Sequence, residues 1–374
     1  MQELADAIEA VAGVLVTRPV STTRLSGGHA WTTLLARDAA GDEWIVRLAP
    51  AGGTMEPYDP AVEAGWIEAA AGSVPAPRVL GLDRSGALLG SPFSVQTRAP
   101  GEVLDLDEVP EVERAAYRRS FASALGALHR EGRAEDMTAD DALATEWLRM
   151  FEEYRRIALH RHPGFEIGLR WLRARLPSGS GRAVLCHGDY RFANVAWTGP
   201  GEIGAVLDWE RAWTGDPMAD IAFTRQFSGW CAVDGDAVAA YEQAAGITVE
   251  DHRVAYGLRF ERARAYLSPL RLMRAIAERR VHDPRLAAIA EAGEAGMWEL
   301  AAWGDGTYLP PLEGELPPVD GPDWSAVLED PGLRAHFDAH PRPSPVDPGD
   351  AEAVAAAVRS WSERQAMRRR RTWH

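Results

Sequence analysis

The sequence predicts an α+β protein, with a small antiparallel sheet near its amino-terminal end and a larger, mostly helical part after it. Within the first 50 residues, two β-rich runs flank a glycine-containing turn. From about residue 112 onward, apolar residues recur mainly at helical spacing, and only one short β-rich island interrupts them. We therefore expect a β-rich lobe over 1–95, a helical lobe over 96–303 and a proline-rich extension over 304–374.

The amino-terminal elements follow from hydrophobic spacing. Leu4, Ile8 and Val11 lie on one face of a helix and predict a short amphipathic helix. The runs 31–36 and 44–48 predict a hairpin around the turn Ala40-Gly41-Asp42. Further elements are expected as a helix over 60–71 and strands over 79–80 and 93–96.

In the remaining chain, helices are expected over 115–129, within 146–176, and from about 220 to 303. Short strands are expected at 183–186, 195–197 and 203–209. Ten of the 25 prolines fall within 304–350, which predicts an extended segment with little regular structure. Asp350 would then cap a last helix, in which Val354, Val358 and Trp361 share one face.

The chain contains no lysine, so all 40 of its basic residues are arginine. A P-loop nucleotidase requires the lysine of its phosphate loop, and a Schiff-base enzyme requires an amine nucleophile. A penicillin-binding type of active site requires the lysine of S-x-x-K. The phosphate-loop motif cannot be present without lysine, and arginine cannot act as an amine nucleophile or proton carrier because its guanidinium keeps its proton in the working pH range. These three enzyme classes are therefore excluded.

Charge and hydropathy narrow the range of partners. The net charge of −15 argues against a nucleic-acid partner, which requires a basic face. No stretch approaches the roughly 18 apolar residues of a membrane span, and Met1-Gln2-Glu3-Leu4 lacks the features of a signal peptide. Two cysteines, Cys186 and Cys231, build no disulfide framework. We expect a cytoplasmic protein that contacts neither nucleic acid nor a membrane, and the oligomeric state stays open.

One segment carries the chemistry. It reads His187-Gly188-Asp189-Tyr190-Arg191-Phe192-Ala193-Asn194, and Asp208-Trp209-Glu210 follows after a hairpin. The expected strand, loop and hairpin bring two carboxylates and one amide oxygen together. Oxygen ligands suit Mg²⁺, which needs few of them from protein when phosphates supply the rest. One carboxylate would remain to accept a proton from an attacking hydroxyl.

H-G-D-x-x-x-x-N followed by Asp-Trp-Glu resembles the aminoglycoside phosphotransferase and choline kinase-like family, which has a protein-kinase-like two-lobe fold. The form in this chain is most similar to bacterial phosphotransferase-family proteins related to acyl-CoA-dehydrogenase-linked kinase domains. The resemblance covers roughly residues 20–300. It implies a small-molecule kinase that uses Mg²⁺ with ATP or GTP and phosphorylates a hydroxyl of an aminoglycoside, a macrolide or a hydroxylated metabolite.

The resemblance also implies roles for individual residues. Asp189 would face the acceptor hydroxyl, Asn194 and Asp208 would hold Mg²⁺, and His187 would brace the catalytic loop. Asp220 is similar to the family's structural aspartate. The nucleotide-binding group would comprise Arg47, Glu63, Gly27, Gly28 and Gln96, with Gly27 and Gly28 in the phosphate-covering turn. Arg47 and Arg191 stand where protein kinases carry lysine. Glu210 is either a second acidic group near the metal or a structural residue.

Two other functions remain open at this point. The chain is alternatively a non-catalytic module that binds a nucleotide or metabolite, or, less well supported, a metal-dependent hydrolase using His187, Asp189 and Asp208. Because a binding module would be free to lose Asn194 or Asp208, the presence of both favours the kinase. A hydrolase usually needs more histidine or carboxylate ligands.

Overall fold

We analysed a computed structural model of the chain, which describes residues 2–25, 30–179, 181–303, 312–340, 346–347 and 349–371. The chain divides into two compact units, and each is described by itself. The first unit comprises residues 1–50, 57–143 and 177–261. The second comprises residues 51–56, 144–176 and 262–374. The three-part division expected at 95/96 and 303/304 stays a prediction.

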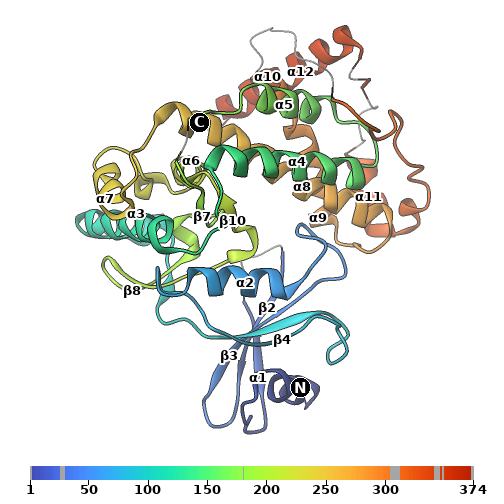
Figure 1. Cartoon of the computed structure of the whole chain (residues 1–374). Helices are drawn as coiled ribbons and strands as arrows, with labels where there is room; N and C mark the ends of the chain where they lie inside the picture. Colours follow the sequence, from blue (N-terminus) through green and yellow to red (C-terminus); the bar gives the residue numbers. More distant parts are fainter. Residues whose placement is uncertain are drawn as a thin grey trace. The chain divides into compact units, whose positions relative to one another are not determined.

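A five-stranded antiparallel sheet opens the first unit (Figure 1). Its strands are arranged in the order β1-β2-β3-β5-β4. Their bounds are Ser21–Arg24 (β1), Thr32–Arg37 (β2), Glu43–Leu48 (β3), Val79–Asp83 (β4) and Phe93–Thr97 (β5). The expected hairpin is β2 and β3, paired from Thr32 with Leu48 to Arg37 with Glu43. The edge strand β1 was missing from the sequence-based prediction, because Ser21–Arg24 has no buried residue to mark it.

The two faces of β3 have different neighbours, since successive side chains of a strand point to opposite sides. Val46 joins a buried cluster with Leu4 and Ile8 of helix α1 (Gln2–Ala12). Burying side chains of this size stabilises the fold by about 1.5–3 kcal/mol each. Arg47 points to the other face, where it meets Glu63 of helix α2 (Pro60–Ala70). The hydrophobic pattern thus places one arginine opposite the α1 face of the sheet.

Helix α2 begins at an Asp-Pro pair. The Asp59 carboxylate accepts a hydrogen bond from the Ala61 N–H at 3.0 Å, and Pro60 occupies the first helical position, where no N–H is needed. The helix lies within one residue of the predicted span 60–71. Because its start is fixed in this way, Glu63 lies one turn in and is buried.

The helical part of the first unit surrounds two small antiparallel sheets. One has the strand order β6-β8-β9 and the other pairs β7 with β10. Helices α3 and α7 lie side by side (Figure 1), and α3 matches the helix predicted over 115–129. The bounds are α3 (Arg114–Glu131), α6 (Pro217–Phe227), α7 (Ala237–Ala245), β6 (Glu102–Val103), β7 (Val184–Cys186), β8 (Val195–Gly199), β9 (Glu202–Val206) and β10 (Trp213–Gly215). A buried apolar cluster that includes Phe121, Tyr190 and Trp209 joins these elements.

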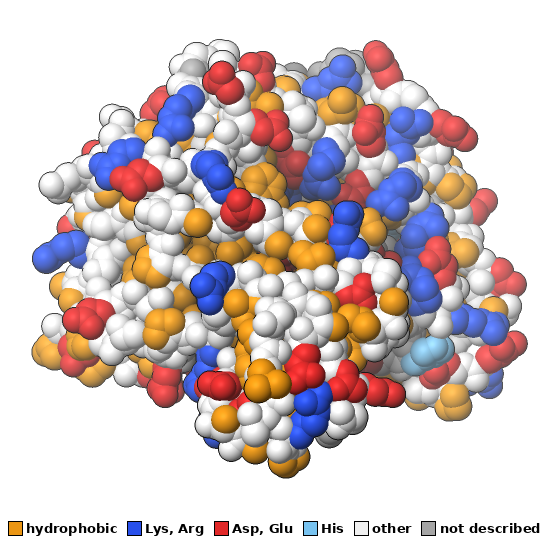
Figure 2. Space-filling model, turned by 60° about the horizontal axis from the view of Figure 1, so that its bottom comes forward, with side chains coloured by type: hydrophobic (Ala, Val, Ile, Leu, Met, Phe, Trp, Pro, Cys, Tyr) orange, Lys and Arg blue, Asp and Glu red, His pale blue; other side chains and the backbone are white. Residues whose placement is uncertain are grey.

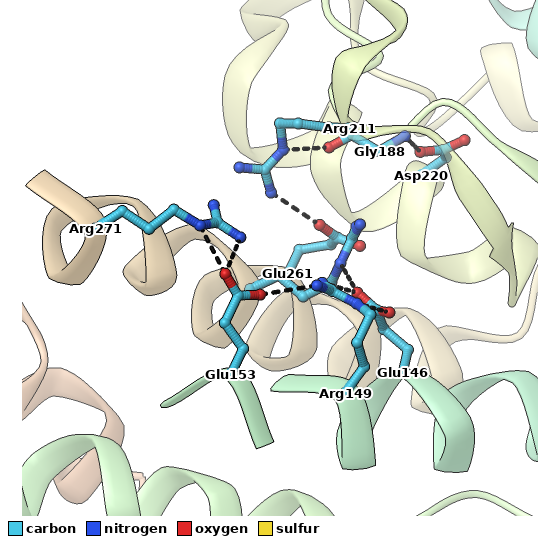
Figure 3. A network of polar contacts seen from close by, with 9 residues as sticks. Glu146, Arg149, Glu153, Gly188, Arg211, Asp220, Glu261 and Arg271 are labelled. Carbon is cyan, nitrogen blue, oxygen red and sulfur yellow. Dashed lines mark hydrogen bonds and ion pairs between the residues drawn. The ribbon is translucent and has the colours of Figure 1, made fainter. Parts of the chain in front are cut away.

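The second unit is built mainly of helices. Helices α4 and α8 run across the unit divisions at 143/144 and 261/262. The bounds are α4 (Ala139–Ile157), α5 (Pro163–Ala174), α8 (Asp251–Ala277), α9 (Pro284–Gly296), α10 (Trp298–Ala302), α11 (Pro331–Ala339) and α12 (Ala351–Arg371). Within this unit, buried Glu146 pairs with Arg149 and Arg264, and buried Glu153 pairs with Arg149 and Arg271 (Figure 3). Arginine–carboxylate pairs thus connect α4 with α8.

The expectation of an extended segment over 304–350 is wrong for part of its length. Residues 331–339 form helix α11, and its Leu333 is buried in an apolar cluster with Leu272 and Ile276. The proline count concealed this helix, because Pro331 begins it after the capping residue Asp330. Asp350 accepts hydrogen bonds from the N–H groups of Glu352 and Ala353, as expected of a cap on the last helix.

Surface charge is mixed on the face shown in Figure 2, where acidic, basic and hydrophobic side chains are interspersed. Within the described part of the chain, no helix combines the length and the apolar character that a membrane crossing requires.

Candidate active site

Strand β7 delivers the H-G-D motif into a tight loop. Gly188 has a φ of +73°, and a Cβ atom built on it would lie 2.2 Å from the carbonyl oxygen of Arg211. Only glycine tolerates both the left-handed backbone and this close approach. The backbone of Arg211 therefore fixes the turn between His187 and Asp189.

Polar groups hold this loop from two sides (Figure 3). The Asp220 carboxylate on α6 accepts hydrogen bonds from the N–H groups of His187 at 2.7 Å and Gly188 at 2.8 Å. Arg211 donates to the Gly188 carbonyl at 3.0 Å and lies 3.4 Å from Glu261. The N–H groups of the loop are thus held by a carboxylate, and its Gly188 carbonyl is held by a guanidinium group.

Asp220 is fully buried, and a charge there needs compensation. Burial alone would raise its pKa. The hydrogen bond from His129, at 3.1 Å, and the backbone N–H groups outweigh burial, so the pKa of Asp220 lies below its usual value. The sequence pointed to Asp220 as a structural aspartate, and its contacts are those of a residue that holds the catalytic loop.

His187 spans the base of the loop. Its Nε2 lies 2.8 Å from the carbonyl oxygen of Leu207, and its Nδ1 accepts from the Asp189 N–H at 3.3 Å. Burial lowers the pKa of His187. Taken together, these partners assign a neutral imidazole with its proton on Nε2, because a carbonyl accepts and an N–H donates.

Asp189 follows at the end of the loop, where its side chain is 18% exposed. Its Oδ1 lies 3.3 Å from Nε of Arg191. Burial raises the pKa of Asp189, and the positive charge of Arg191 opposes this rise. The Asn194 amide nitrogen donates to the Asp189 carbonyl at 2.9 Å, which directs the amide oxygen of Asn194 away from that carbonyl.

Arg47 forms the centre of a buried ion cluster. Its Nη1 lies 2.6 Å from Oδ1 of Asp208, its Nη2 lies 2.5 Å from Oε2 of Glu210, and its Nε lies 3.2 Å from Oε2 of Glu63. Burial raises the pKa of Glu63 and raises the pKa of Glu210 to about 8, while Arg47 opposes both shifts. The indole ring of Trp31 lies 5.8 Å from the guanidinium carbon of Arg47.

Asp208 occupies an uncommon backbone conformation. Its φ and ψ are 61° and 62°, the left-handed region that few residues other than glycine, asparagine and aspartate adopt. The chain leaves β9 at Val206 and turns there, which brings the Asp208 carboxylate to Arg47 and starts the 3-10 turn Trp209–Arg211. The sequence predicted a strand through 209 and missed this turn.

These groups line one cavity of about 510 Å³ in the first unit. Seven residues for which the sequence predicted a place in the site line it, namely Arg47, Glu63, Gln96, Arg191, Asn194, Asp208 and Glu210. Asp189 and His187 precede Arg191 on the same loop. Gly27 and Gly28, expected in a phosphate-covering turn, lie outside the described residues.

Sequence reasoning missed two participants. Arg211 supports the catalytic loop, and Trp31 lies over Arg47. For Arg211 the available signal was its position directly after the Asp-Trp-Glu motif. For Trp31 it was only an aromatic residue at the start of a strand, which core packing explains equally well.

The donor set of this cavity fits Mg²⁺. Asp208 and Glu210 offer carboxylate oxygens and Asn194 offers an amide oxygen, the ligands that hard cations prefer. A carboxylate has lone pairs on both oxygens, so Asp208 has capacity for a cation in addition to Arg47.

Residues 21–258, more than half of the chain, match the model of the phosphotransferase enzyme family. The chain belongs to this enzyme family. Among curated proteins, it is 27% identical over 230 residues to acyl-CoA dehydrogenase family member 10 of Mus musculus. It is 31% identical over 140 residues to viomycin phosphotransferase of Streptomyces vinaceus. These alignments cover 58% and 35% of this chain, but only 21% and 48% of those proteins.

Solved structures show the same fold. A candidate aminoglycoside phosphotransferase from Ralstonia eutropha aligns with a TM-score of 0.58 at 18% identity, over 81% of this chain and 98% of that one. A thermostable mutant of an aminoglycoside phosphotransferase, in a ternary complex with AMP-PNP and hygromycin B, aligns with a TM-score of 0.52 at 18% identity. That alignment covers 82% of this chain and 100% of the other. This member of the family therefore has the protein-kinase-like fold, as predicted.

Proposed function

We propose that this protein transfers the γ-phosphoryl group of ATP or GTP directly to a hydroxyl group of a small molecule, with Mg²⁺. The observation that carries the proposal is that Arg47, Arg191, Asn194 and Asp208 line the same cavity. Phosphoryl transfer depends mainly on positioning and on neutralising charge at the phosphates, and these two arginines and the oxygen ligands supply both.

The proposed roles follow the contacts. Asp189 would orient the acceptor hydroxyl and take its proton, and its raised pKa makes it a stronger proton acceptor than an ordinary aspartate. The acceptor oxygen forms a bond to the γ-phosphorus while the bond from that phosphorus to the bridging oxygen breaks. The electron pair of that bond leaves with the nucleoside diphosphate. His187 would position Asp189 through the loop backbone.

Asn194 and Asp208 would hold Mg²⁺, which supplies positive charge to the phosphate oxygens when bound. Arg47 and Arg191 would add fixed charge next to them, and neither role requires the loss of a proton. Glu63 and Gln96 would position Arg47 and line the nucleotide cavity.

The proposed acceptor class is an antibiotic such as an aminoglycoside or macrolide, or a hydroxylated metabolite. The relatives support antibiotics, since one is named a viomycin phosphotransferase and one solved structure holds hygromycin B. One relative is named an acyl-CoA dehydrogenase family member, and we therefore include hydroxyacyl thioesters and the corresponding hydroxy acids among the candidate acceptors.

Release of ADP in the presence of Mg-ATP tests the proposal. The acceptor panel would include hygromycin B, viomycin, macrolides, hydroxy acids and hydroxyacyl thioesters, and Asp189→Asn would be compared with the wild type. We expect one acceptor class to stimulate ADP release, and Asp189→Asn to lower kcat by about 10²–10⁴-fold with nucleotide binding retained. Asp236→Asn, at an exposed ion pair, is the matched control.

Two results would replace the proposal. If neither protein releases ADP above blank while Mg-ATP still raises the melting temperature, the protein is a nucleotide-binding module. If phosphate esters are cleaved without nucleotide, it is a metal-dependent hydrolase.

A further inference from the structure

A second cluster of ligating side chains lies in the second unit and is independent of the proposed phosphotransfer. His160 and His162 lie between α4 and α5, and Glu294 lies on α9. One ligand atom from each of these three side chains lies within 4.8 Å of the other two. We propose that His160, His162 and Glu294 form a binding site for Zn²⁺ or a similar divalent transition metal.

The distances fit tetrahedral coordination. Nε2 of His160 lies 3.0 Å from Oε1 of Glu294, and Nδ1 of His162 lies 3.5 Å from the same oxygen. With metal–ligand bonds of about 2.0–2.2 Å, two ligands of a tetrahedral zinc ion are separated by roughly 3.3–3.6 Å. Small side-chain movements of a few tenths of an ångström would therefore bring these atoms to coordination distances.

The arrangement of the two rings supports a shared cation. Their centroids are 4.3 Å apart at an interplanar angle of 37°, and one nitrogen of each ring lies within 3.5 Å of Oε1 of Glu294. His160 is 8% exposed and His162 is 6% exposed. The Nδ1 atom of His160 is buried without a hydrogen-bond partner, so no hydrogen bond at that atom holds the ring away from Glu294.

The chemistry of the cluster differs from that of neighbouring buried acids. Glu146, Glu153 and Glu166 are each paired with arginine, whose guanidinium group stays protonated and is not a metal ligand. Glu294 faces two imidazoles. A neutral imidazole binds a metal through the ring nitrogen that carries no proton. Two nitrogens and one carboxylate oxygen select zinc and related transition metals over Mg²⁺.

The local fold would make this metal site a structural link. The chain fixes His162 at the start of α5 by a hydrogen bond from its N–H to the Tyr154 hydroxyl, at 2.9 Å. The neighbouring Arg161 N–H donates to the Pro318 carbonyl at 2.7 Å, which holds a residue beyond α10 beside the His160–His162 segment. A bound metal would join the α4–α5 turn to α9, with water as a fourth ligand.

Isothermal titration of the full chain with ZnCl2 tests the site, using untagged protein that has been treated with a chelator and dialysed. We expect one equivalent of Zn²⁺ to bind and to raise the melting temperature. His160→Ala and His162→Gln should each weaken binding by about tenfold or more. His282→Ala is the matched control, because His282 pairs with a single carboxylate, Asp330, outside the cluster.

A second measurement does not depend on stability. Co²⁺ bound by imidazole and carboxylate gives visible absorption bands, which should appear in the wild type and in His282→Ala and be absent from His160→Ala. The proposal is overturned if the wild type binds no more Zn²⁺ than His160→Ala does, or if His282→Ala removes binding to the same extent. An excess of MgCl2 should not displace Co²⁺ from this cluster, and loss of the Co²⁺ absorption bands on adding Mg²⁺ would also contradict the assignment.

Discussion

Nη1 of Arg47 lies 2.6 Å from Oδ1 of Asp208, although 161 positions separate the two residues in the sequence. The contact joins the third strand of the amino-terminal sheet to the turn after β9. Since Arg47 also pairs with Glu63 and Glu210, a single buried cation contacts three acidic side chains. We expect a positive charge in this position to stabilise the fold and, under the proposed function, to bind phosphates.

Replacing Arg47 therefore should affect both stability and nucleotide binding. Arg47→Ala leaves acidic groups buried without their cation, and we expect the free energy of unfolding to fall by about 3 kcal/mol. The KM for the nucleotide should rise as well. Arg47→Lys should recover only part of the stability. Its ammonium group restores the positive charge but lacks the planar fork that spans several carboxylates.

Urea denaturation and nucleotide kinetics measure these effects. Arg98→Ala is the control, since Arg98 lines the same cavity but is 47% exposed and pairs with Glu43 at the surface. Its stability should change little. Wild-type stability and an unchanged KM in Arg47→Ala would contradict the assignment.

Gly188→Ala should damage the catalytic loop. A Cβ atom there would lie 2.2 Å from the Arg211 carbonyl, and the φ of +73° is strained for alanine. We expect a loss of about 1–3 kcal/mol in the free energy of unfolding from backbone strain, increased further by the clash. Turnover should fall strongly because Asp189 moves with the loop.

Gly90→Ala is the control that separates the effect of backbone strain from the effect of a steric clash. Gly90 has a φ of +75°, and nothing lies within 4 Å of a Cβ atom built on it. It should therefore show the cost of strain alone, with turnover unchanged. Equal effects of the two substitutions on turnover would show that the contact with Arg211 is unimportant.

Asp220→Asn should change how stability depends on pH. The folded protein holds the pKa of Asp220 below its usual value, because His129 and backbone N–H groups donate to the carboxylate despite its burial. The ionised carboxylate thus stabilises the fold above its unfolded pKa, and this stabilisation is lost as the pH falls through the lower folded pKa. The variant should be less stable at pH 7, and the difference should shrink toward acid pH.

Urea denaturation of both proteins between neutral and acid pH measures this difference. Asp236→Asn, at an exposed position, should follow the wild-type curve. A stability difference between Asp220→Asn and wild type that is constant with pH would be inconsistent with a depressed pKa.

Both cysteines should resist thiol reagents in the folded protein. Cys186 and Cys231 are fully buried, and burial raises the pKa of Cys231 to about 12. The reactive thiolate is therefore scarce at neutral pH. We expect slow colour development with a disulfide reagent in buffer and rapid reaction of two thiols in denaturant. Cys231→Ser should lower the number of thiols that react in denaturant to one, and fast labelling of Cys186 in the native protein would contradict this prediction.

Much of the fold and cavity was predictable from local patterns. The hairpin β2–β3, helix α2 and helix α3 follow from apolar spacing and turn residues, which act over a few neighbours. The motif residues Asn194 and Asp208 were identified from their spacing, and the structure places both on one cavity.

The missed features depend on contacts between distant segments or on competing local signals. The support of Gly188 by Arg211 joins residues 23 positions apart, and the left-handed backbone of Asp208 ends what reads as a continuing strand. Helix α11 was missed for a different reason, since its starting proline was counted with the prolines of an extended segment. A capping aspartate directly before a proline would have identified it.

The guanidinium of Arg47 has a practical consequence for chemical labelling. Nucleotide acyl-phosphate probes report kinases by acylating a lysine amine beside the phosphates, and this chain offers no side-chain amine anywhere. Profiling by such probes would pass over this enzyme even when its cavity is filled. A dicarbonyl reagent such as phenylglyoxal, which reacts with guanidinium groups, is the appropriate label, and protection by Mg-ATP would identify the arginines of the cavity.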